Sequence, residues 1–266
     1  MKNFLLLIAV LACCGCVKMA EKHFDTGLLK VNSQDYEGAI IDFSKAIEIN
    51  PSWAEAYYNR GLAESKLNDF IEAIEDYTKA IEYKPNFAMA YDSRGQAKSN
   101  IQDYIGAIAD HSMAIEIDPQ YSAAYNKRGN AKENLQDYIG AIADYNMAIT
   151  LNPKKDLYYL NRGNTKRQLK DYNNAISDFT KAIDINATDM YFYSRGNVKG
   201  DIKDYVGAIA DFTQAIEINP KNAEAYYYRG IAKHLLGQNN SACLDFSKAG
   251  ELGYINAYET IRRYCQ

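Results

Sequence analysis

The feature that most constrains this chain is a repeat of about 34 residues. The dipeptide Arg-Gly recurs in steps of 34, 34, 34, 33 and 34 residues. Its arginines are Arg60, Arg94, Arg128, Arg162, Arg195 and Arg229. An Ala-Ile dipeptide and, in most units, a closing proline follow the same period. A period of this length indicates one supersecondary unit per repeat, so the chain is predicted to be an array of stacked copies.

Each unit is predicted to hold two amphipathic helices. In residues 52–85 the second helix is marked by apolar residues three and four positions apart. These are Phe70, Ala73, Ile74, Tyr77, Ala80 and Ile81. Asp69 precedes this helix, where a carboxylate favours the positive N-terminal end, and Pro85 ends it. Two such helices cannot bury their apolar faces alone, so neighbouring units must stack into a solenoid.

The unit resembles the tetratricopeptide repeat (TPR) family. The residues that carry the resemblance are Tyr57, Gly61, Ala73, Tyr77, Ala80 and Pro85. The resemblance covers residues 18–254 and implies an all-α fold, a right-handed α-solenoid of about seven helical hairpins. The seven predicted units are 18–51, 52–85, 86–119, 120–153, 154–186, 187–220 and 221–254. Residues 255–266 are predicted to form a C-terminal capping helix, with Ile255, Tyr258 and Ile261 on one side and Arg262 and Arg263 on the other.

The N-terminal residues have the pattern of an export signal. An apolar run, residues 4–12, follows Lys2 and ends in small residues, which is typical of a signal peptide over residues 1–12. Nine helical residues reach only about 14 Å, roughly half of a hydrocarbon core. The run is therefore too short for a permanent membrane span.

The sequence around Cys13 resembles the lipobox of bacterial lipoproteins. The resemblance implies that Cys13 is diacylated after signal cleavage, with Cys14 as the alternative, and that residues 13–17 form a lipidated tether. A diacyl anchor would give stable membrane attachment. An ordinary secretory signal cut after Ala12 stays open as the other interpretation.

Two cysteines lie at the other end of the chain. Cys243 stands where the six preceding repeats have Ile, so it is predicted to be a small buried apolar side chain. Export would permit a disulfide with Cys265, but the spacing alone leaves that pairing open.

The sequence offers no catalytic constellation. It contains no phosphate-binding loop, dinucleotide-binding turn or nucleophile elbow, and no His or Cys pair at metal-ligand spacing outside the signal region. The net charge is −4 with Lys and Arg scattered singly, which argues against nucleic acid as a partner. His111 is predicted to be a polar substitute in an aromatic core position. We expect no enzyme activity, cofactor, metal ion or small-molecule substrate.

An aspartate follows each repeated arginine by sixteen residues. These aspartates are Asp76, Asp110, Asp144, Asp178, Asp211 and Asp245. The spacing predicts a ladder of ion pairs that neutralises the basic stripe. Because Thr26 replaces the arginine in the first unit, Asp42 is predicted to pair with Arg60 of the next unit. The ladder is therefore expected to include pairs between neighbouring units.

Ligand-binding positions are predicted where the first helices differ between repeats. The candidates are Tyr58, Leu62, Asp92, Gln96, Asn126, Asn130, Asn164, Tyr193, Asn197 and Tyr227, with Leu160 and Ile231 in the same two rows. In the TPR family this face lines a concave groove that holds extended peptides or partner helices. Asn and Gln suit the backbone amides of a peptide, and Tyr suits amphipathic contacts. A groove that is merely solvated is the alternative.

These features predict a protein–protein interaction scaffold of the bacterial cell envelope. It would be exported, lipid-anchored at the outer membrane or periplasmic face, and would bind a peptide or partner protein in its groove. The alternatives are a secreted, unanchored TPR binding protein and a regulator of an envelope enzyme.

Overall fold

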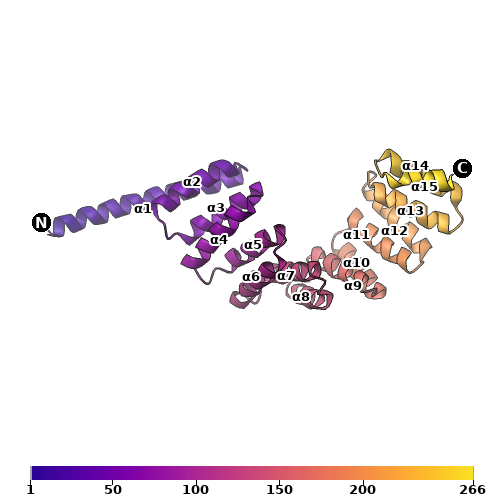
Figure 1. The fold of residues 1–266 in the computed structure, drawn as a ribbon, viewed down its shortest axis with the longest axis horizontal. Coiled ribbons are helices and arrows are strands. Elements are labelled where there is room, and N and C mark those ends of the chain that lie inside the picture. Colours follow the sequence, from indigo (N-terminus) through magenta and orange to yellow (C-terminus); the bar gives the residue numbers. More distant parts are fainter. Residues whose placement is uncertain (1, 266) are drawn as a thin grey trace. The chain divides into compact units, whose positions relative to one another are not determined.

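In a computed structural model the backbone is described for residues 2–265 and the side chains for residues 17–265. All regular secondary structure in residues 2–265 is helical, and the fifteen helices pack as consecutive hairpins (Figure 1). The predicted all-α repeat fold is thus confirmed. The chain divides into two compact units, residues 1–135 and 136–266.

The first unit contains three hairpins and the helix that follows them. In each hairpin the second helix packs against its partner and against the first helix of the next hairpin. The helices are α1 (Lys2–Asn32), α2 (Tyr36–Ile49), α3 (Ala54–Leu67), α4 (Phe70–Tyr83), α5 (Ala88–Asn100), α6 (Tyr104–Ile117) and α7 (Ser122–Asn134).

The second unit repeats this arrangement with one leading helix, three hairpins and a terminal helix that packs on α14. Its helices are α8 (Tyr138–Leu151), α9 (Asp156–Gln168), α10 (Tyr172–Ile185), α11 (Asp189–Asp201), α12 (Tyr205–Ile218), α13 (Ala223–Leu235), α14 (Asn239–Glu251) and α15 (Asn256–Tyr264).

The predicted signal peptide and lipidation site fall on residues whose side chains are not among those described. Cys13 and Cys14 both belong to this segment. In the part of the chain that the structure describes, no helix combines the length and the apolar character needed to cross a membrane.

An aspartate begins most of the second helices. Asp35, Asp103, Asp137 and Asp204 each accept a hydrogen bond from the backbone N–H of a glycine three residues later, at 2.9–3.0 Å. A Cβ on Gly106 would lie 2.2 Å from Asp103 Oδ2, so glycine lets the carboxylate approach the helix end. Asp69 lies at the same position without this side-chain bond, and Glu72 stands where the four repeats with the bond have glycine. Asp69 therefore stabilises α4 only through its negative charge near the helix N-terminus.

The repeated glycine of the Arg-Gly dipeptide packs against an aromatic ring of the second helix. A Cβ on Gly196 would lie 2.8 Å from Phe212 Cε1, closer than side-chain carbons normally approach. His111 fills the equivalent position opposite Gly95 and is fully buried, as predicted for a polar substitute in an aromatic position. Glycine therefore sets the distance between the two helices of the hairpins within each unit.

The C-terminal helix α15 buries only a narrow face. Ala257 and Thr260 form the buried face of α15, whereas Ile255 is 80% and Tyr258 55% exposed. A hydrogen bond between the Tyr227 and Thr260 hydroxyls, 3.1 Å long, ties this face to α13. The predicted apolar side of the cap is therefore largely solvent-exposed.

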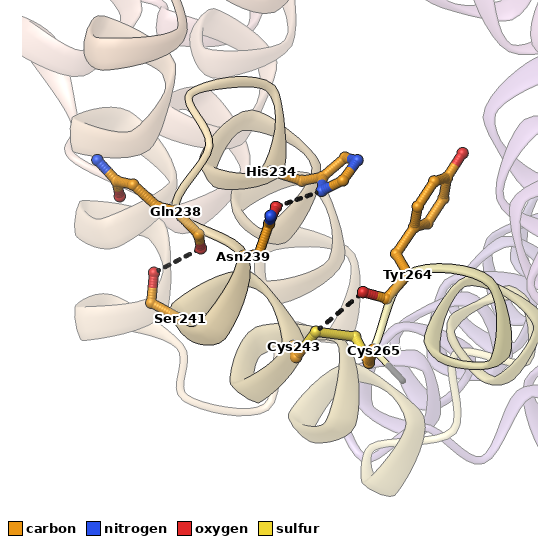
Figure 2. The surroundings of a disulfide bond; sticks show 7 residues. All are labelled: His234, Gln238, Asn239, Ser241, Cys243, Tyr264 and Cys265. Atoms are coloured by element: carbon orange, nitrogen blue, oxygen red, sulfur yellow. Dashed lines mark hydrogen bonds between the residues drawn. A yellow bond between two sulfur atoms is a disulfide. The ribbon is translucent and has the colours of Figure 1, made fainter.

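Cys243 and Cys265 form a disulfide with their Cα atoms 5.7 Å apart (Figure 2). Cys243 lies on α14 and Cys265 directly follows α15, so the bond fixes the terminal helix to the last hairpin. The prediction of Cys243 as a small buried apolar side chain was wrong, because this residue is half-buried and bonded to Cys265; the pairing that the sequence left open is the one formed.

Candidate functional site

The repeated arginines form two-point ion pairs within their own hairpins. In each pair Nε and Nη2 donate to the two carboxylate oxygens at 2.5–2.9 Å. The pairs are Arg60–Asp76, Arg94–Asp110, Arg162–Asp178, Arg195–Asp211 and Arg229–Asp245. A lysine four residues after the arginine also contacts the same carboxylate at 2.7–2.8 Å. These lysines are Lys98, Lys166, Lys199 and Lys233.

The predicted pair between Asp42 and Arg60 of the next unit is wrong. Lys30 Nζ contacts Asp42 at 2.6 Å, and Arg60 binds Asp76 of its own hairpin. Neighbouring hairpins are linked instead by the arginine Nη1, which donates to a hydroxyl or amide oxygen of the preceding second helix. The acceptors are Ser44, Thr78, Ser112, Asn146, Thr180 and Thr213. The N–H groups of the repeated arginines thus bond to other residues of the array and do not point to a ligand.

Glu64 is an exception in this ion-pair framework. It occupies the position at which other repeats carry lysine, and its Oε2 is buried without a hydrogen-bond partner. The nearest cation is the Arg60 guanidinium, with Nε 3.9 Å from Oε1. Burial, and then the charge of Asp76, raises the pKa of Glu64 to about 8.

The first row of predicted ligand positions is mostly packed between hairpins. Tyr58, Asp92, Asn126 and Leu160 are 8%, 2%, 5% and 6% exposed. Tyr193 and Tyr227 are half-buried among aromatic rings. The physical reason is that this row faces the adjacent hairpin, so its variation between repeats reflects packing as well as surface chemistry.

Asp92 is the most deeply buried residue of this row. Its carboxylate accepts hydrogen bonds from Tyr121 Oη at 3.0 Å and Lys127 Nζ at 2.7 Å, and His111 Nδ1 lies 3.0 Å away. Burial by itself would raise the pKa of Asp92, but the contacts with His111 and Lys127 hold it below the usual range. Asp92 therefore joins two hairpins and is not presented to a ligand.

The second row, four residues further along the first helices, opens onto the surface of the array. Leu62 and Gln96 line a cavity of about 270 Å³ in the first unit, and Asn197 and Ile231 line one of about 210 Å³ in the second. Asn130 is half-buried and Asn164 is exposed, and neither lines these two cavities.

The first-unit cavity lies between α3 and α5, with Phe70 and Tyr77 of α4 at its floor. Its walls carry the polar side chains of Ser93, Gln96 and Asn100. The exposed side chain of Lys66 and the Asp92-bound Lys127 complete the lining. This cavity offers amide, hydroxyl and ammonium donors over an aromatic floor.

The second-unit cavity lies between α11 and α13, over Tyr205 and Phe212 of α12. Its walls are mainly apolar and include Tyr228, Ile231 and Leu235. The charged groups that line it are Arg167 and Asp201, which pair with each other at 2.7 Å.

The two cavities occupy equivalent places in the repeat. Leu62 and Asn197 are 135 residues apart, and the same offset relates nine lining residues of one cavity to lining residues of the other. The candidate residues predicted from the sequence do not include Ser65, Lys66, Ser93, Asn100, Gly200, Asp201, Tyr228 or Leu235. Several of these lie three or four residues beyond the second row, so extending the helical face by one turn would have found them.

Known families and structures match this architecture. The tetratricopeptide repeat family matches residues 54–87, 122–155 and 157–189, and the TPR repeat family matches residues 27–67 and 196–237. No curated protein matches the chain in sequence.

In the residues that the structure describes, no group of His, Cys, Asp and Glu side chains could hold a metal ion.

Solved structures share the fold at low sequence identity. A tetratricopeptide repeat protein from Parabacteroides merdae aligns with a TM-score of 0.69 and 19% identity over 94% of this chain and all of that one. PilF of Pseudomonas aeruginosa gives 0.67 and 17% over 77% of this chain and 94% of its own. YrrB, a TPR protein with an unusual peptide-binding site, gives 0.60 and 20% over 71% of this chain and 99% of its own. These likenesses concern the fold.

Proposed function

This chain belongs to the tetratricopeptide repeat family of non-enzymatic protein-interaction scaffolds, and we propose that it holds a peptide segment of a partner protein at the bacterial cell envelope. The observation that carries the groove assignment is the pair of equivalent cavities on the first-helix face. Their linings vary between repeats, whereas the arginine–aspartate pairs that do not vary are satisfied internally.

The lining chemistry supports a peptide ligand. Gln96, Asn100 and Asn197 carry amide groups that can both donate to and accept from a peptide backbone. Both cavities are smaller than the roughly 300–1,000 Å³ of small-molecule sites. Single side chains of an extended or helical segment would therefore enter them.

Selection of peptides tests this groove directly. A phage-displayed library of random 12-residue peptides would be panned on the disulfide-intact protein, and the selected peptides would be synthesised and titrated by fluorescence anisotropy. Gln96→Arg with Asn197→Arg should weaken binding at least tenfold, since both cavities are then obstructed. The matched control is Lys181→Ala, because the 63%-exposed Lys181 lies on α10 and lines neither cavity. No selected peptide, or equal binding by both variants, would contradict the groove assignment.

The proposed export rests on two independent features. The predicted signal peptide ends at Ala12, next to the lipobox-like Cys13. The Cys243–Cys265 disulfide also favours an oxidising compartment outside the cytosol. We infer a lipid-anchored scaffold at the envelope, with a secreted, unanchored binding protein as the alternative if cleavage follows Ala12 without lipidation.

Intact mass of the mature protein from a bacterial membrane fraction distinguishes these two forms. A diacylated N-terminus that disappears in Cys13→Ser and persists in Cys14→Ser would support anchoring through Cys13, and the reverse pattern would assign Cys14. An unmodified mature protein that begins at Cys13 and is recovered from the soluble fraction would overturn the anchor and favour the secreted form.

A further inference from the structure

The two equivalent cavities differ at eight of their nine corresponding lining positions, and four of these differences make the second-unit cavity more open or less polar. At these four positions a serine or amide side chain of the first-unit cavity is replaced in the second by glycine or by a larger, less polar side chain, whereas Leu62 is replaced by Asn197. Ser65 corresponds to Gly200, Ser93 to Tyr228, Gln96 to Ile231 and Asn100 to Leu235. The same surface of the repeat is thus built with contrasting chemistry in the two units.

Gly200 is not explained by packing. A Cβ on Gly196, in the same helix α11, would lie 2.8 Å from Phe212 Cε1, so that glycine is needed for close approach. A Cβ on Gly200 would meet no atom within 4 Å, and its backbone does not have the positive φ that favours glycine. Gly200 lines the cavity, and its missing side chain leaves that space open.

The apolar walls are partly exposed to solvent. Tyr228 is 36% and Leu235 53% exposed, and both line the same cavity as Ile231. Covering these side chains would remove apolar surface from water, which is favourable at about 25 cal/mol per Å². Arg167 and Asp201 neutralise each other at 2.7 Å, so the lining provides no unbalanced charge for a charged group to meet.

We propose that the second-unit cavity, opened by Gly200, receives one large aliphatic or aromatic side chain from the peptide segment of a protein partner. This inference rests on the proposed groove function and assigns its specificity. The volume of about 210 Å³, the apolar walls and the balanced charge together match an uncharged side chain. Asn197 at the edge of the cavity supplies an amide that can bond to the backbone next to the inserted residue.

Gly200→Leu is the decisive variant because it fills the cavity from within. No atom lies within 4 Å of the added Cβ, so the protein should fold with an unchanged or higher melting temperature. The probes are the synthetic 12-residue peptides selected on the wild-type protein. Their affinity for Gly200→Leu should fall at least tenfold, and the selected sequences should share a Leu, Ile, Met, Phe or Trp whose replacement by Ala gives a similar loss.

Two variants distinguish a loss of binding caused by the second-unit cavity from a loss caused by any change in the groove. Ser65→Leu places the same side chain at the equivalent position of the first unit and should leave the dependence of binding on the apolar peptide residue intact. Leu235→Asn installs the residue of the first-unit cavity at an exposed position and should weaken binding several-fold without filling space.

A double-mutant cycle completes the test. Combining Gly200→Leu with the Ala-substituted peptide should add little further loss, because both changes remove the same contact. If Gly200→Leu and Leu235→Asn bind as the wild type does while Gln96→Arg with Asn197→Arg does not, the cavity assignment is overturned and the groove function stands. If the library yields no binder, both are overturned.

Discussion

Arg195 and Asp211 form a two-point ion pair, with Nε 2.9 Å from Oδ2 and Nη2 2.7 Å from Oδ1. Lys199 Nζ lies 2.8 Å from the same Oδ2, and the third arginine nitrogen, Nη1, donates to Thr180 of the preceding hairpin at 3.0 Å. One carboxylate therefore holds two cations of α11, and the arginine connects two hairpins. The arrangement recurs through the array, which makes it a structural element of the repeat.

Asp211→Asn should destabilise the second unit strongly. The Asp211 side chain is 4% exposed, and its two cations are 17% and 19% exposed, so the variant leaves both facing a neutral amide. Removing one partner of a buried pair costs about 3–5 kcal/mol. Urea unfolding measures the change, and Glu251→Gln, which breaks the exposed Lys248–Glu251 pair, should cost less than about 1 kcal/mol. Equal costs for the two variants would contradict the assigned role.

Alanine at two glycines of α11 should have opposite effects. Gly196→Ala brings a Cβ to 2.8 Å from Phe212 Cε1, so we expect a loss of about 1–3 kcal/mol through overpacking. Gly200→Ala meets no atom within 4 Å and should stabilise by up to about 1 kcal/mol through higher helix propensity. Thermal unfolding of both variants provides the measurement. A destabilised Gly200→Ala protein would show that this position is constrained by something other than the cavity.

Glu64 should make stability fall as the pH rises. Its pKa is raised from 4.5 to about 8 in the folded protein, so between these values the unfolded chain loses a proton that the folded chain keeps. The free energy of unfolding contributed by this group therefore decreases from about pH 4.5 to about pH 8. Glu64→Gln should remove this slope, so that its melting temperature exceeds that of the wild type at pH 8 more than at pH 5.

Glu64→Lys provides the matched variant for this prediction. It installs the residue that contacts the aspartate in the next hairpin, where Lys98 Nζ lies 2.8 Å from Asp110. We expect it to melt several degrees above the wild type at pH 8. A wild-type pH profile that coincides with that of Glu64→Gln would rule out the raised pKa.

The disulfide should control the docking of α15. Cys243 and Cys265 are 22 residues apart, and a bond that closes a loop of this size contributes about 2–4 kcal/mol. In Cys265→Ser the backbone amides of α15 should exchange with solvent much faster than in the oxidised wild type. Cys243→Ile, which supplies the residue of the other repeats, should improve α14 packing but leave α15 equally unprotected. Unchanged protection in both variants would show that Ala257 and Thr260 hold the helix without the bond.

The repeated hairpins could be predicted from the sequence because the signals that form them are local. Apolar residues at three- and four-residue spacing, an aspartate before the second helix and glycine at the helix contact recur with the period of the repeat. Stacking follows, since one hairpin leaves its apolar faces uncovered. The position of His111 in the aromatic core was predicted on the same grounds.

The aspartate to which an arginine binds could be identified only from the tertiary structure. Arg60 has Asp42 on one side and Asp76 on the other at similar sequence distances, and only helix packing places Asp76 within reach. The sequence also assigned Tyr58 and Asp92 to the groove, whereas hairpin stacking buries them.

The sequence by itself thus determined the helices and their pairing into hairpins, because both depend on local periodicity. The face of the groove stays a prediction from the resemblance to the TPR family. Only the tertiary structure decided that part of the second row lines the cavities, that Gly200 lines one of them and that Cys243 bonds to Cys265. Those outcomes depend on distances between helices, which no spacing along a single helix specifies.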